Sequence, residues 1–168
     1  MSLRLTGSAS RARPEAETRV ASVRVRASLR FRQVANVINL STLLGLLVAA
    51  IGRARIVRGA DGLLLARDYR LSVPRAPAFT IGNVILVRLT DEQLAGRPTL
   101  LRHEARHATQ YAFCIGPVML PLYFLAAGWS WLRCRDFAWH NAFERLAGLA
   151  DGGYVDPRPA GRQRREVA

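Results

Sequence analysis

The sequence predicts an α+β fold in which a small antiparallel sheet packs against two helices. Residues 54–58 and 63–67 favour strands and flank a Gly-Ala-Asp-Gly turn, which is typical of a β-hairpin. The run 79–89 is rich in β-branched residues and predicts a further strand. Helical patterns follow at 98–113 and 138–150. We therefore expect the sheet to come first in the chain and the two helices to pack on it.

The boundaries of these helices rest on local signals. Thr90-Asp91-Glu92-Gln93 has the spacing of a capping box, and Pro98 suits a first helical turn. The uncharged stretch 111–132 contains prolines and glycines, so we expect two short buried helices separated by a kink. The last helix is expected to end at the Asp-Gly-Gly sequence that begins at Asp151.

The net charge of +13 is concentrated at the two ends of the chain, and all 25 basic residues are arginine. Residues 1–32 have a net charge of +6 and residues 158–168 have +3, which leaves +4 for residues 33–157. We expect disordered basic arms at 1–32 and 158–168 around a single domain at 33–157. Because the central segment is only weakly basic, the charge argues against nucleic acid as the partner, although binding through the arms stays open as an alternative.

Two uncharged stretches, 34–51 and 111–132, leave membrane association open. We interpret both as buried core, but residues 1–51 or 111–132 could contact a membrane. The tryptophans of the second stretch and its flank, Trp129, Trp131 and Trp139, are expected in the core. The first 33 residues lack an apolar core, so we expect a cytoplasmic or membrane-associated protein rather than one secreted through a cleavable signal peptide.

A metal-binding pattern lies in the helix predicted at 98–113. His103-Glu104-Ala105-Arg106-His107 is an HExxH sequence. Histidines four residues apart lie on one helix face, so both imidazoles can reach one Zn²⁺ ion. Glu104 is offset from that face and can act as the general base on water. The alternative is a helix that binds no metal, with Glu104 paired to an arginine.

A catalytic zinc needs a third protein ligand, and two candidates lie in the helix predicted at 138–150. Glu144 and His140 are four residues apart and are expected on one helix face. The spacing alone does not choose between them. Tyr111, in the motif helix, and Tyr123 could either stabilise an oxyanion or pack in the core.

The motifs of this region resemble those of small bacterial zincin-like metallopeptidases, of the kind grouped as DUF4157. The resemblance covers roughly residues 79–155 and is carried by these positions: His103-Glu104-x-x-His107-x-x-Gln110, Gly116-Pro117, Leu120-Pro121-Leu122-Tyr123 and Asn141-x-Phe143-Glu144-x-x-Ala147-Gly148. It implies that His103, His107 and Glu144 bind zinc with Glu104 as general base. Gln110 matches the pattern without an assigned role, and His140 stays open either as an alternative ligand or as a residue that contacts a ligand.

We therefore expect a zinc-dependent metallopeptidase-like protein that hydrolyses peptide bonds with a metal-activated water. An extended peptide or protein substrate would pair with the predicted strand at 84–89. The alternative is a non-catalytic metal-binding or membrane-peripheral protein with a relic HExxH site. The short, apolar segment between the motif and Glu144 leaves little room for substrate-binding subdomains and argues for this alternative.

Overall fold

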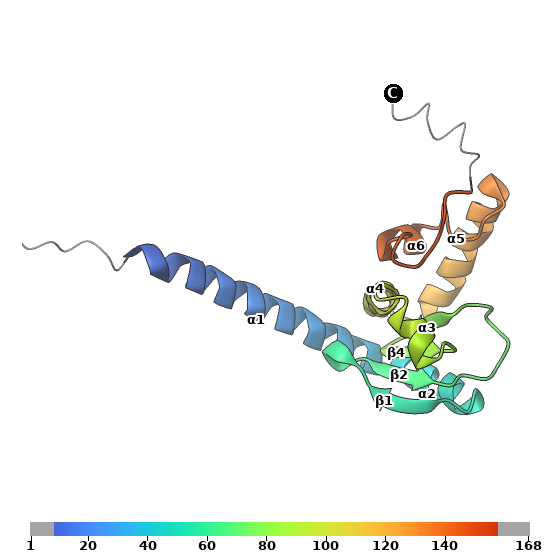
Figure 1. Cartoon of the computed structure of the whole chain (residues 1–168), viewed down its shortest axis with the longest axis horizontal. Coiled ribbons are helices and arrows are strands. Elements are labelled where there is room, and N and C mark those ends of the chain that lie inside the picture. Colours follow the sequence, from blue (N-terminus) through green and yellow to red (C-terminus); the bar gives the residue numbers. More distant parts are fainter. Residues whose placement is uncertain (1–8, 158–168) are drawn as a thin grey trace, which may run out of the picture.

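The computed structural model describes residues 9–157, with side chains from residue 21 onward, so the predicted basic tail at 158–168 lies outside the described residues (Figure 1). The helices are α1 (Ala9–Ile38), α2 (Ser41–Ile51), α3 (Asp91–Ala95), α4 (Leu100–Phe113), α5 (Met119–Cys134) and α6 (Ala142–Ala147). The strands are β1 (Arg55–Arg58), β2 (Leu64–Arg67), β3 (Ala78–Ile81) and β4 (Val84–Val87). Short 3₁₀ turns, η1 (Ala60–Gly62) and η2 (Gly116–Val118), complete the order. The α+β fold class is confirmed.

The four strands form one sheet in the order β1-β2-β4-β3. The predicted hairpin is confirmed, because β1 and β2 pair antiparallel across η1. β3 and β4 also pair antiparallel, but β2 and β4 run parallel, so the sheet is mixed and not wholly antiparallel. The parallel pairing joins two separate hairpins, and such long-range contacts leave no local signal in a sequence.

The run 79–89 is a second hairpin, whereas one strand was predicted. The chain reverses at Gly82 and Asn83, and Gly82 has a φ of 61°. A Cβ atom at Gly82 would lie 2.5 Å from the backbone of α2, so only glycine permits this close approach. β4 is fully buried and paired on both sides. The prediction that residues 84–89 receive a peptide strand is therefore wrong, because β4 has no free edge.

The core lies on both faces of the sheet. Along β4, Val84 and Leu86 pack in the cluster that includes Ala49 of α2, while Ile85 and Val87 pack with residues of α4. This alternation follows from the two-residue period of a strand. α4 is thereby held flat against one face, with β3 as its nearest strand.

Residues 9–32 are helical, whereas a disordered arm was predicted for 1–32; residues 1–8 of that arm lie outside the described part. Alanine and arginine both favour helix, which explains how a polar segment extends α1 beyond the body of the protein (Figure 1). The C-terminal end of α1 is anchored through buried Asn36. Its Nδ2 donates to Asn83 Oδ1 at 3.0 Å and to the Ala108 carbonyl at 2.8 Å. α1 therefore crosses the domain boundary expected at residue 32.

The segment after α4 differs from its prediction in two ways. The stretch 111–132 folds as the end of α4, η2 and the 16-residue helix α5, in place of two short buried helices. The last helix is α6 and begins only after Asn141, whose side chain accepts from the amide of Phe143. The preceding residues form a turn in which the Asp136 carboxylate accepts from the amides of Ala138 and Trp139.

Among residues 9–157, no single helix has both the length and the apolar character needed to cross a bilayer. Two bent helix pairs meet these criteria only when their members are taken together. They are the end of α1 with α2, bent by 70°, and α4 with η2 and α5, bent by 112°.

Candidate metal centre

Helix α4 carries the HExxH sequence and presents it to the interior. Its buried positions follow the helical period along the face that packs on the sheet. They are Leu100, His103, Glu104, His107, Ala108 and Tyr111. Both histidines and the glutamate between them are thus removed from bulk water.

Three potential ligand atoms converge between α4 and α6. Nε2 of His103 lies 3.1 Å from Nε2 of His107 and 3.1 Å from Oε2 of Glu144. Nε2 of His107 lies 3.5 Å from the same Oε2. Ligands held at about 2.0–2.1 Å from a tetrahedral ion are separated by about 3.3 Å, so this triangle matches one face of such a coordination shell. The buried group His103, His107 and Glu144 could hold a metal ion.

Each imidazole is oriented by a contact on its other nitrogen. Nδ1 of His103 lies 3.0 Å from the carbonyl oxygen of Gly148 and donates to it. Nδ1 of His107 donates to Oε1 of Gln110 at 2.8 Å, and Nε2 of Gln110 donates to the Phe143 carbonyl at 2.9 Å. Both Nε2 atoms then keep a free lone pair facing Glu144. Such outer contacts fix the tautomer of metal-binding histidines.

The two carboxylate oxygens of Glu144 differ in their contacts. The Tyr123 hydroxyl donates to Oε1 at 2.5 Å, while the buried Oε2 has no hydrogen-bond partner among the described residues. An unpartnered buried carboxylate oxygen is costly unless a cation neutralises it, so this atom fits a metal ligand. Burial favours the neutral acid, but the close contacts with the two imidazoles and the hydrogen bond from Tyr123 outweigh it and hold the pKa of Glu144 well below its usual value.

Glu104 points to the sheet side of the same centre. Its Oε2 accepts a hydrogen bond from Thr80 Oγ1 at 2.7 Å, and the same hydroxyl lies 3.1 Å from the Glu104 carbonyl oxygen. Burial raises the pKa of Glu104 above its ordinary value, against the lowering effect of His107 and Thr80. A carboxylate with a raised pKa beside a metal site is suited to take up a proton.

A cavity of about 170 Å³ opens beside these residues. Its walls are mainly apolar and come from the loop before β3, from β3 itself, from α4 and from α5. Tyr111, Tyr123 and Tyr154 lie in its lining with the two histidines. Burial raises the pKa of all three phenols, so they remain protonated and can donate hydrogen bonds.

The loop after α6 closes over His103. Arg102 and Arg106 of α4 pair with the Asp151 carboxylate at 2.7 and 2.6 Å, and they lower the pKa of Asp151 to about 2. A Cβ atom at Gly152 would lie 2.8 Å from Cε1 of His103, so glycine lets the loop approach the imidazole. The ion pairs therefore hold the loop where it supports His103.

The structure brings together most of the sequence-predicted site residues. His103, Glu104, His107, Gln110, Tyr111 and Glu144 all lie at this centre. His140 does not: it is exposed, lies before α6, and its backbone amide donates to Ser130 Oγ. Because α6 starts at Ala142, His140 and Glu144 do not share a helix face.

Sequence reasoning missed two residues of the site. Thr80 reaches Glu104 only because β3 packs on α4, and no local pattern indicates this contact. Tyr154 lies near His103, with ring centroids 5.9 Å apart, after a loop that the sequence only marks as a helix end. The Gly-Gly pair at 152–153 was the available signal that the chain turns back there.

Comparisons with known proteins found no matching family model, curated protein or solved structure. The resemblance to zincin-like metallopeptidases therefore stays a prediction.

Proposed function

We propose that this protein is a zinc-dependent hydrolase that cleaves peptide bonds. The observation that carries the proposal is the triangle of His103 Nε2, His107 Nε2 and Glu144 Oε2, with sides of 3.1 to 3.5 Å, beside buried Glu104. Two imidazoles and one carboxylate form a donor set that suits zinc and leaves a position open. When bound, a zinc ion supplies Lewis-acid polarisation of a carbonyl oxygen and acidifies water.

Residues of the chain itself can carry out proton transfer and stabilise the developing negative charge. Glu104 accepts the proton of the attacking water and returns it to the leaving amine, while Thr80 holds its carboxylate in place. Tyr154 is a protonated phenol at the cavity wall and can donate to the oxygen on which negative charge develops, whereas Tyr123 donates to Glu144 and holds that carboxylate in place. The apolar walls limit water around the reacting groups.

Among residues 9–157, β3 pairs with β4 alone, and its other edge supports an extended peptide as the substrate. In the β3–β4 pairing, Ile81 opposes Val84 across the two-residue turn, so Ile81 and Phe79 bond to β4. The peptide groups of Ala78 and Thr80 then face away from β4, and both residues line the cavity. A substrate strand could pair with these groups and present its carbonyl to the metal centre.

The test compares the wild type with Glu104→Gln, both loaded with zinc, on a fluorogenic peptide mixture and unfolded casein. We expect Glu104→Gln to keep its zinc and lose at least 100-fold of the hydrolysis rate, since a general base contributes about 10²–10⁴. Glu92→Gln, an exposed change on α3, is the matched control and should keep full activity. Zinc-loaded wild type without activity would support the non-catalytic alternative.

A further inference from the structure

The two helix bends of the molecule lie against each other. Nδ2 of Asn39, between α1 and α2, donates to the Tyr111 carbonyl near the end of α4 at 3.2 Å. A Cβ atom at Gly116 would lie 2.6 Å from Cγ of Asn39, so the two turns touch. The rings of Phe31 on α1 and Phe113 on α4 are 5.7 Å apart.

These bends present large apolar side chains to solvent. We define the apolar bend patch as Phe31, Ile38, Leu40, Phe113, Ile115 and Val118, all of which are exposed. Exposed stripes continue from it along both neighbouring helices. On α2 the stripe is Leu43, Leu47 and Ile51, and on α5 it is Leu122, Leu125, Trp129 and Leu132. An apolar surface of this extent marks an interaction site.

Two patch residues occupy backbone positions that disfavour them. Leu40 has a φ of 66° and is 60% exposed, and Ile115 has a φ of 55° and is 75% exposed. The left-handed region suits glycine or asparagine, and a β-branched residue such as Ile115 is strained there. In water, an exposed leucine or isoleucine side chain adds no stability to these turns. The choice of apolar side chains is explained when the turns enter an apolar medium.

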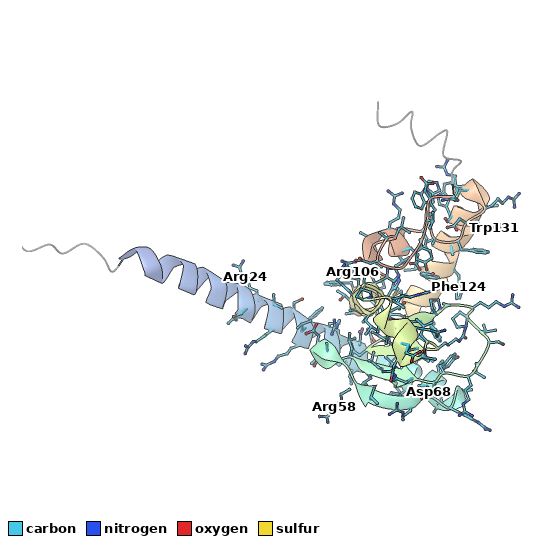
Figure 2. The ribbon with its side chains drawn as sticks, viewed as in Figure 1. Arg24, Arg58, Asp68, Arg106, Phe124 and Trp131 are labelled. Atoms are coloured by element: carbon cyan, nitrogen blue, oxygen red, sulfur yellow. The ribbon has the colours of Figure 1, made fainter. Side chains whose placement is uncertain are left out.

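Arginines border this surface, and acidic residues are absent from its segments. Residues 18–60 and 105–135 contain no Asp or Glu. Arg30 precedes the patch on α1, and Arg53 follows the α2 stripe. At the end of α5, Arg133 lies over the Trp129 ring at 4.8 Å and Arg135 over Trp131 at 5.5 Å. Figure 2 labels Trp131 on α5 and Arg24 on the extended part of α1.

We propose that the protein docks on the surface of a bilayer rich in anionic lipids, with the apolar bend patch inserted among the acyl chains. Exposed tryptophans and arginines at the ends of the apolar stripes suit the headgroup region, where an aromatic ring meets water and a cation meets phosphate. The bends of 70° and 112° place the two turns at the tips of their helix pairs, so the turns can enter one leaflet without the helices crossing it. The sequence placed Trp129 and Trp131 in the core; their exposure is explained by this role.

α5 then connects the membrane surface with the candidate metal centre. Leu120 and Tyr123 line the cavity, while Leu122 and Leu125 belong to the exposed stripe. Docking is independent of metal binding and catalysis, so it can be tested on the full chain whatever the outcome for the proposed hydrolase.

The test is flotation of the full chain with vesicles of phosphatidylcholine and phosphatidylglycerol (3:1) or of phosphatidylcholine alone. The variant Leu40→Asn/Ile115→Asn replaces apolar residues by one that tolerates the left-handed region, so its fold should be preserved and is checked by circular dichroism. Leu146→Asn, an exposed change on α6, is the control. We expect the wild type and the control to bind anionic vesicles, and the double variant to bind at least fivefold less.

Three results would overturn the proposal. They are absence of wild-type binding to the anionic vesicles, equal binding by the wild type and the double variant, and a dimer in solution that the double variant dissolves while vesicle binding is absent. The last result would assign the patch to self-association. Membrane docking is supported if the wild type binds neutral vesicles more weakly than anionic ones. A blue shift of tryptophan emission on anionic vesicles supports it as well.

Discussion

Gln110 Oε1 accepts a hydrogen bond from Nδ1 of His107 at 2.8 Å, and this contact decides which nitrogen of His107 faces Glu144. The amide of Gln110 is itself oriented, because its Nε2 donates to the Phe143 carbonyl one residue before Glu144. One side chain thus links a candidate ligand on α4 to the helix that carries another. These two hydrogen bonds explain physically why a glutamine occupies the last position of the HExxHxxQ pattern.

Gln110→Ala should weaken zinc binding roughly tenfold, since loss of an outer contact to a metal-binding histidine typically costs 10–100-fold. Affinity is measured by competition with a chromophoric zinc chelator. Thr109→Ala, on the neighbouring position of α4, is the control and should bind like the wild type. Unchanged affinity in Gln110→Ala would show that the glutamine does not orient the imidazole.

Thr80→Val should lower the hydrolysis rate roughly tenfold at unchanged zinc content, because Glu104 loses the hydroxyl that positions its carboxylate. Valine keeps the size and β propensity of threonine, so the sheet is retained. Peptide cleavage and metal content are measured on the same samples. Thr80→Ser should restore most of the rate; a serine variant as slow as the valine variant would argue against the hydrogen bond.

Asn36→Ala should destabilise the fold by about 1–3 kcal/mol, because Asn83 Oδ1 and the Ala108 carbonyl lose a buried donor. The free energy of unfolding is measured in urea. Val37→Ala, an exposed neighbour on α1, should have little effect. Equal stability of Asn36→Ala and the wild type would mean that the end of α1 is not part of the folded unit.

Asp151→Asn should lower the melting temperature at neutral pH, and the difference from the wild type should shrink in acid. Arg102 and Arg106 depress the pKa of Asp151 to about 2, below the value of about 3.9 for an unfolded aspartate. Its contribution is therefore present above about pH 4 and is lost as the pH falls through about 2.

The control for Asp151→Asn is Asp68→Asn. Asp68 lies 3.8 Å from Arg55 with both side chains largely exposed, so this change should leave the melting temperature unaltered at each pH. A difference between Asp151→Asn and the wild type that persists unchanged at pH 2 would contradict the assigned ion pairs.

Local signals in the sequence were sufficient for the first hairpin and for the motif helix. The turn at 59–62 is rich in residues that tolerate positive φ, and Asp61 and Gly62 adopt it. The second hairpin was missed because Gly82 and Asn83 interrupt an apolar run without polar flanks. The parallel pairing of β2 with β4 was not predictable, since it depends on how two hairpins pack.

The candidate site shows the same limit. His103, Glu104 and His107 follow from helical spacing, which is a local property. The choice between His140 and Glu144 depended on where α6 begins, and the turn at Asp136 shifts that start to Ala142. Thr80 and Tyr154 reach the centre only through tertiary packing.

Zinc binding by His103, His107 and Glu144 together is tested by metal stoichiometry. The wild type, His103→Ala, Glu144→Gln and His140→Ala are equilibrated with equimolar zinc, passed through a desalting column and analysed for metal. We predict one zinc per chain in the wild type and in His140→Ala, and substoichiometric zinc in the other two. A wild type without zinc, or full zinc in Glu144→Gln with loss in His140→Ala, would show that these three residues are not the zinc ligands.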